Sequence, residues 1–139
     1  MTIERDLQAI KLAASALQGA EILLLDSVGE LRSVYRLASV AVIGGSFLPF
    51  GGHNPLEPGA LGKAIVFGPE MFNFREAAKI FLQAGAAWQC GAKKLGAALV
   101  GLLTDEEACR TLGRLAAETI RKNQGAAGNG SQHVLCELE

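Results

Sequence analysis

The sequence lacks an excess of either charge. Its 139 residues hold 13 basic and 14 acidic side chains, which gives a formal net charge of −1. Proteins that gather nucleic acid or anionic lipid by long-range attraction ordinarily carry clustered Lys and Arg. The composition therefore disfavours both kinds of partner.

The sequence is also poor in cysteine and in unbroken apolar runs. Its three cysteines, Cys90, Cys109 and Cys136, are an odd number without a C-x-x-C pair, which indicates neither a disulfide framework nor a zinc site and fits a reducing cytosol. Residues 37–56 carry no charged side chain, but glycines and prolines at 44, 45, 49, 51, 52 and 55 exclude a membrane-spanning helix there. No secretory signal pattern opens the sequence.

Several familiar motifs are missing. Residues 44–52 do not give G-x-G-x-x-G, and residues 62–64 lack the upstream glycine and the Ser/Thr of a P-loop. There is no G-x-S-x-G, no H-E-x-x-H and no cysteine with an evident base. These absences disfavour dinucleotide-binding and NTPase functions, and no complete catalytic machinery is visible.

Short apolar runs alternate with helical patterns along a chain of one domain's length. The predicted strands are 21–25, 40–43, 65–67 and 86–88, and the predicted helices are 5–18, about ten residues from 31, one from 54, one from 73 and one from 104 to about 122. Capping boxes mark three of these helix starts: Ser27 with Glu30, Asn73 with Glu76, and Thr104 with Glu107. The pattern predicts an α/β fold, a parallel sheet with helices on both faces.

Ligands of such sheets bind beyond the carboxyl ends of the strands. This rule selects two loops, 26–30 and 44–57, and six glycines lie between 44 and 62, where backbone could come close to a ligand.

Asn54, Pro55 and Glu57 read as a helix start, with Asn54 as N-cap and Pro55 at the first helical position. A helix start alone is enough to explain why these residue types occur here. Free amides at a helix start also suit a phosphate or carboxylate, and an ionised Glu57 could accept hydrogen bonds from sugar hydroxyls. Taken alone, the pattern favours the structural interpretation.

Gly29 and Glu30 present the same two alternatives, since Glu30 is an adequate capping residue behind Ser27. Two such starts at one sheet edge, each with a glutamate, favour a ligand site over coincidence. His53 could donate to an anion or only cap a turn.

Residues 26–31 (DSVGEL), Tyr35, 42–47 (VIGGSF), 51–58 (GGHNPLEP), Gly68-Pro69 and Asn73-Phe74 together carry a resemblance. They resemble the C-terminal domain of 3-deoxy-D-manno-octulosonic acid (Kdo) transferases, over roughly residues 21–86. The resemblance implies the second Rossmann-like domain of a GT-B glycosyltransferase. It also implies transfer of Kdo from CMP-Kdo to the lipid A precursor in lipopolysaccharide biosynthesis, with inversion and without metal or cofactor, at the cytoplasmic side of the inner membrane.

The resemblance assigns CMP or CMP-Kdo binding to seven residues: Val28, Gly29, Glu30, Asn54, Pro55, Leu56 and Glu57. Glu57 is expected on the ribose hydroxyls. The amides around Gly29, Asn54 and Leu56 are expected on the phosphate or the Kdo carboxylate.

The resemblance also implies that residues 1–124 are a partial nucleotide-sugar-binding domain and that residues 125–139 are a loose tail. The acceptor-binding domain, the catalytic base and all membrane contact then belong to an N-terminal half with no counterpart here. We expect the isolated domain to be soluble, cytoplasmic and inactive. One alternative is a non-enzymatic α/β ligand-binding or interaction module derived from such a transferase, and another is an enzyme using a different nucleotide sugar on the same fold.

Overall fold

The computed structural model describes residues 8, 11, 12, 15, 18–25 and 29–125. The chain divides into two compact units between residues 38 and 39, and each is described by itself.

In the first unit, the described residues between 8 and 15 are helical, in agreement with the predicted helix 5–18. The predicted strand 21–25 is wrong: residues 22–25 adopt no regular structure, and Ile22 and Leu24 are 86% and 83% exposed. An apolar run becomes a strand only where a neighbour pairs with its backbone groups, and composition alone does not supply that neighbour.

The helix α2 (Leu31–Tyr35) is half the predicted length. Glu30 is its N-cap residue, and the Glu30 carbonyl accepts a hydrogen bond of 3.1 Å from the Val34 amide. Gly29 precedes it at φ +90°, a left-handed conformation that disfavours residues with a Cβ. Ser27, the other half of the predicted capping box, lies outside the described residues.

The second unit is built on a parallel sheet of three strands in the order β1-β2-β3. The strands are β1 (Val40–Val42), β2 (Ala64–Phe67) and β3 (Trp88–Gln89). The strand β3 begins at Trp88, two residues after its predicted start at residue 86. Val40 pairs with Ala64, and Val66 pairs with Trp88. The parallel α/β prediction is confirmed for this unit.

Within residues 39–125, five helical elements surround this sheet: α3 (Leu56–Ala60), η1 (Phe72–Phe74), α4 (Arg75–Gln83), α5 (Ala92–Thr104) and α6 (Glu106–Gly125). The helix α5 was not predicted, and α6 begins two residues later than predicted. Asp105, not Thr104, caps α6, because its Oδ1 accepts a 3.1 Å hydrogen bond from the Ala108 amide. The Thr104 hydroxyl instead donates to the Val100 carbonyl, within α5.

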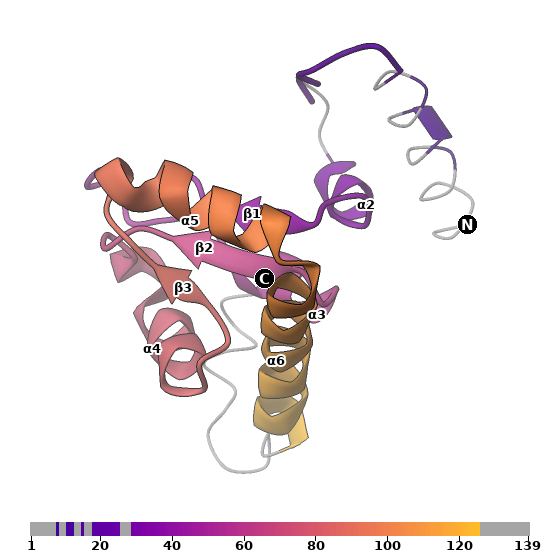
Figure 1. Cartoon of the computed structure of the whole chain (residues 1–139). Helices are drawn as coiled ribbons and strands as arrows, with labels where there is room; N and C mark the ends of the chain where they lie inside the picture. Colours follow the sequence, from indigo (N-terminus) through magenta and orange to yellow (C-terminus); the bar gives the residue numbers. More distant parts are fainter. Residues whose placement is uncertain (1–7, 9–10, 13–14, 16–17, 26–28, 126–139) are drawn as a thin grey trace. The chain divides into compact units, whose positions relative to one another are not determined.

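Alternate residues of β2 face opposite sides, as a strand requires. Ile65 and Phe67 belong to a buried cluster with residues of α3, α4 and α6, whereas Ala64 and Val66 belong to a second cluster with residues of α5 and α6. Figure 1 shows α4 and α5 on opposite sides of the sheet. Helices therefore cover both faces, as predicted.

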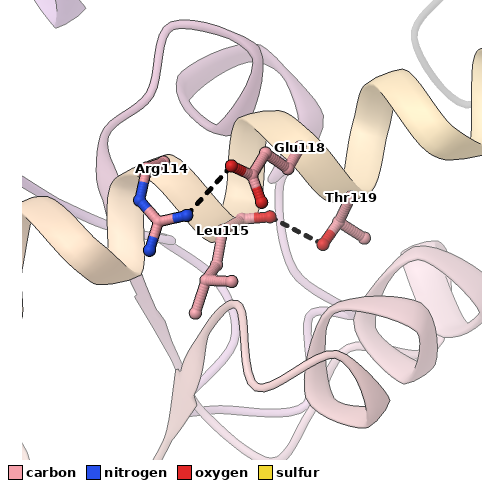
Figure 2. Close-up of polar contacts among 4 residues, drawn as sticks. All are labelled: Arg114, Leu115, Glu118 and Thr119. Carbon is pink, nitrogen blue, oxygen red and sulfur yellow. Dashed lines mark hydrogen bonds and ion pairs between the residues drawn. The ribbon is translucent and has the colours of Figure 1, made fainter.

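The helix α6 carries polar contacts within itself (Figure 2). Arg114 Nη1 lies 2.9 Å from Glu118 Oε1, and the Thr119 hydroxyl donates a 2.6 Å hydrogen bond to the Leu115 carbonyl. An exposed pair of this spacing contributes only about 0.3–0.5 kcal/mol, so α6 is held mainly by its buried face. Among the described helices, none combines the length and the apolar character needed to cross a membrane.

Candidate functional site

The candidate site in the second unit lies where β1 and β2 end. Ile43 continues the pairing beyond β1, since its amide donates a 2.9 Å hydrogen bond to the Val66 carbonyl. The chain then enters the glycine-rich loop 44–55, next to the Gly68-Pro69 turn after β2. This is the edge at which parallel α/β sheets bind ligands.

Ser46 ties these two strand ends together and is fully buried. Its hydroxyl donates to the Ile43 carbonyl at 2.6 Å and accepts from the Gly68 amide at 2.8 Å, and its carbonyl accepts from the Glu70 amide at 2.9 Å. A Cβ on Gly68 would collide with the Ser46 carbonyl. No role was predicted for Ser46, because the two hydrogen-bond partners of its hydroxyl follow two different strands.

The glycine-rich loop folds back on itself. The Gly52 amide donates to the Gly45 carbonyl and the His53 amide donates to the Gly44 carbonyl, both at 3.0 Å. The His53 ring lies beside this turn, since a Cβ on Gly44 would come within 3.2 Å of His53 Cδ2. The loop is therefore closed by its own backbone.

The space beside Gly51 and Gly52 is filled by protein. Both have left-handed φ angles, +91° and +80°, and both are buried. A Cβ on Gly51 would lie 2.5 Å from Asn73 Cγ, and one on Gly52 would meet the sulfur of Met71. These glycines thus let the loop pack against residues 71–73, in a place where ligand approach was predicted.

Asn73 holds this contact and does not cap α4, contrary to the predicted capping box. Its amide donates to the Gly51 carbonyl at 2.9 Å, and its side-chain Nδ2 donates to the Phe50 carbonyl at 3.1 Å. The N-cap residue of α4 is Phe74, without a side-chain capping bond. The hydrogen bonds of Asn73 to the glycine-rich loop therefore take the place of a capping bond at α4.

The predicted helix start is confirmed to within one residue, because α3 begins at Leu56 with Pro55, and not Asn54, as its N-cap residue. Asn54 Oδ1 accepts a 2.9 Å hydrogen bond from the Leu56 amide, and Pro55 already has helical angles of φ −82° and ψ −11°. Pro55 and Leu56 are fully buried. Their side chains therefore support the loop, and the Leu56 amide is already occupied by the cap.

Three polar side chains of this segment reach the surface: His53 is exposed, and Asn54 and Glu57 are half-buried. Within the described part of the chain, no hydrogen bond or ion pair engages the Glu57 carboxylate or the His53 ring. Glu57 lies in the first turn of α3. The carboxylate is thus available to accept hydrogen bonds from a ligand.

The other predicted loop belongs to the first unit. Val28 lies outside the described residues, Gly29 has open space where its Cβ would be, and Glu30 begins α2. That this loop forms one site with Asn54 and Glu57 stays a prediction. No set of three or more His, Cys, Asp and Glu side chains suited to a metal ion occurs among the residues that the structure describes.

Comparison with known proteins yields one consistent relationship. A Haemophilus influenzae 3-deoxy-D-manno-octulosonic acid transferase is 33% identical over 111 residues, which is 78% of this chain and 26% of that protein. The Bordetella pertussis transferase of the same name is 45% identical over 67 residues, 48% of this chain and 16% of the relative. No protein-family model matches. The matches span about a quarter or less of the length of these curated relatives.

A solved structure gives the same result. The C-terminal CMP-Kdo binding domain of WaaA from Acinetobacter baumannii superposes with a TM-score of 0.66 at 35% identity, covering 70% of this chain and 51% of that one. The resemblance to the C-terminal domain of Kdo transferases, expected from the sequence, is confirmed.

Proposed function

We propose that this chain is the donor-binding part of a glycosyltransferase that transfers Kdo from CMP-Kdo to the lipid A precursor. The observation that carries the proposal is the position of the G-G-H-N-P-L-E-P segment. It follows β1 at the carboxyl edge of a parallel sheet, in a chain that resembles a CMP-Kdo binding domain over most of its length. The sheet edge indicates the position of a ligand site, and the similarity indicates a nucleotide sugar as the ligand.

In this proposal Glu57 accepts hydrogen bonds from the ribose hydroxyls. Its carboxylate is half-buried and engages no other described group, so a hydroxyl pair would not have to displace a partner. Asn54 positions this glutamate by fixing the first turn of α3 through its bond to the Leu56 amide. Pro55 and Leu56 contribute by packing beneath the segment.

Val28, Gly29 and Glu30 form the second proposed binding segment. The left-handed Gly29 leaves its surroundings open to a bulky anion, since nothing lies within 4 Å of the place of a Cβ. The Gly29 and Asn54 amides remain proposed donors to the phosphate or the Kdo carboxylate.

The remaining parts of the activity belong to the complete transferase. We propose a GT-B enzyme of lipopolysaccharide biosynthesis at the cytoplasmic side of the inner membrane, in which the other domain supplies the acceptor site and the catalytic base. Residues 1–124 form the donor domain in this proposal, and residues 125–139 a tail. The chain alone is then inactive.

Isothermal titration of the full chain with CMP tests the donor assignment. We expect binding to the wild type and a loss of about tenfold or more for Glu57→Ala, since hydrogen bonds to a charged group contribute about 1.5–3 kcal/mol. Glu76→Ala is the matched control, because Glu76 also lies in the first turn of a helix.

Equal affinities for wild type, Glu57→Ala and Glu76→Ala would remove Glu57 from the proposed site. Tighter binding of UMP than of CMP would favour a different nucleotide sugar. Kdo transfer recovered when a relative's N-terminal half is supplied in trans would distinguish a transferase domain from a non-enzymatic binding module.

A further inference from the structure

His53 is a polar residue of the glycine-rich loop whose ring has no described partner. The ring is exposed, and within the described part of the chain no hydrogen bond or ion pair engages it. The sequence allowed two roles for this side chain, donation to an anion or the capping of a turn. The turn is closed by the His53 backbone amide, which donates to the Gly44 carbonyl at 3.0 Å, so the ring itself caps nothing.

The ring packs by one edge against the two glycines that follow β1. A Cβ on Gly44 would lie 3.2 Å from His53 Cδ2 and 3.9 Å from Nε2, and one on Gly45 would lie 3.5 and 3.6 Å from the same two atoms. A side chain at position 44 would therefore crowd the ring. In an imidazole, Nδ1 is the atom opposite the Cδ2–Nε2 edge. The packing thus holds the ring at the carboxyl end of β1, with Nδ1 on the side away from the glycines.

This end of β1 offers few other side-chain donors to an anion. Residues 37–56 contain no Lys or Arg, so His53 is the side chain of this segment that can carry a positive charge. The Ser46 hydroxyl is fully buried and already makes two hydrogen bonds. Lys63 precedes β2, which places it at the opposite edge of the parallel sheet. An anion bound after β1 would therefore meet His53 beside the side-chain amide of Asn54.

We propose that His53 donates a hydrogen bond from Nδ1 to the phosphate of the bound cytidylate. The inference rests on the proposed function, in which the Glu57 carboxylate accepts from the ribose hydroxyls. Glu57 follows four residues after His53, a span of at most about 14 Å, so one nucleotide can reach both side chains. An acceptor then faces the hydroxyls and a donor faces the anion, and a hydrogen bond to an ionised phosphate is among the strong ones.

Titration of the full chain with CMP and with cytidine tests this contact, because the two ligands differ only in the phosphate. His53→Phe keeps a ring against the glycines and removes the nitrogen, whereas His53→Asn loses the ring and places an amide nitrogen near the position of Nδ1. We expect His53→Phe to bind CMP at least about tenfold more weakly and cytidine as the wild type does. His53→Asn should keep most of the CMP affinity. Glu57→Ala, by contrast, should weaken both ligands.

Lys79→Gln is the charge control, since it removes an exposed cation from α4 and should bind CMP as the wild type does. Circular dichroism of each variant confirms that a loss of affinity is not a loss of fold. An unchanged CMP affinity of His53→Phe would overturn the proposed contact, as would equal losses for CMP and cytidine or an equal loss in Lys79→Gln. If Glu57→Ala still weakens CMP binding in that case, the proposed function stands without His53. A wild-type chain that binds neither ligand would refute both.

Discussion

Replacing Ser46 with alanine isolates the link between the ends of β1 and β2. The substitution keeps the Cβ and removes only the hydroxyl, which makes two buried hydrogen bonds, to the Ile43 carbonyl and from the Gly68 amide. The Gly68 amide is left buried without its acceptor. Leaving a buried donor unsatisfied costs about 1–3 kcal/mol, so we expect a loss near the upper end of that range.

Urea unfolding followed by circular dichroism measures this loss. The midpoint should fall while the slope with denaturant stays unchanged, because the surface exposed on unfolding does not change. In a thermal scan a loss of about 3 kcal/mol corresponds to roughly 10 °C in a domain of this size.

Ser39→Ala is the control, since Ser39 is exposed and its carbonyl, which the substitution keeps, is the group that contacts Cys109. It should stay within about 0.5 kcal/mol of the wild type. Similar stabilities for the Ser46 and Ser39 variants would refute the view that the hydroxyl holds the two strand ends together.

Three other substitutions test the packing and the cap. Gly52→Ala should lower the free energy of unfolding in urea more than Gly85→Ala does. Both glycines have a positive φ, where an alanine is strained by about 1–2 kcal/mol, but only at Gly52 does a neighbouring side chain occupy the place of the new Cβ. Equal losses would contradict the described packing of Gly52 against Met71. By the same measurement Asn54→Ala should lower the free energy of unfolding by about 1 kcal/mol, and Asn54→Ser should lower it little, because serine can also accept the hydrogen bond from the Leu56 amide. An unchanged stability of Asn54→Ala would show that this bond does not stabilise the fold. Phe81→Ala, at a fully buried position, should lose about 3–5 kcal/mol, and a loss below about 1 kcal/mol would show that the site is not a packed core.

Local chemistry made part of this structure predictable. The β2 strand is an apolar run bounded by glycines, and all of its residues are buried. Asn54 and Pro55 favour a helix start through their own conformational preferences, and those preferences decide the geometry found. Short-range signals of this kind need no knowledge of distant residues.

The errors concern contacts between distant residues. Asn73 has the same capping preference as Asn54, but its hydrogen bonds go to a loop more than twenty residues away. The helix α5 was missed although Leu95, Leu99 and Leu102 give it an inward face, because Gly96 and Gly101 weaken its helical pattern. Residues 21–25 were predicted as a strand that the structure does not contain, because their β propensity is not accompanied by a neighbouring strand that pairs with them.

In the candidate site, too, some residues could be predicted from local sequence and others could not. Glu57 could be proposed as a candidate from the sequence because a carboxylate after glycines at a sheet edge is a local pattern, and its role in binding stays a prediction. Ser46 could not be assigned its role, since both strand ends must be in place before its hydroxyl has two partners.

Among the described helices, α6 alone supplies buried residues to both faces of the sheet, with Leu112 in one cluster and Ala116 and Ile120 in the other. During synthesis the three strands leave the ribosome before this helix does. Until it emerges, apolar side chains on both faces of the nascent sheet lack part of their cover, a condition that favours aggregation and chaperone binding. The second unit is therefore expected to reach its native state only after translation has passed residue 120.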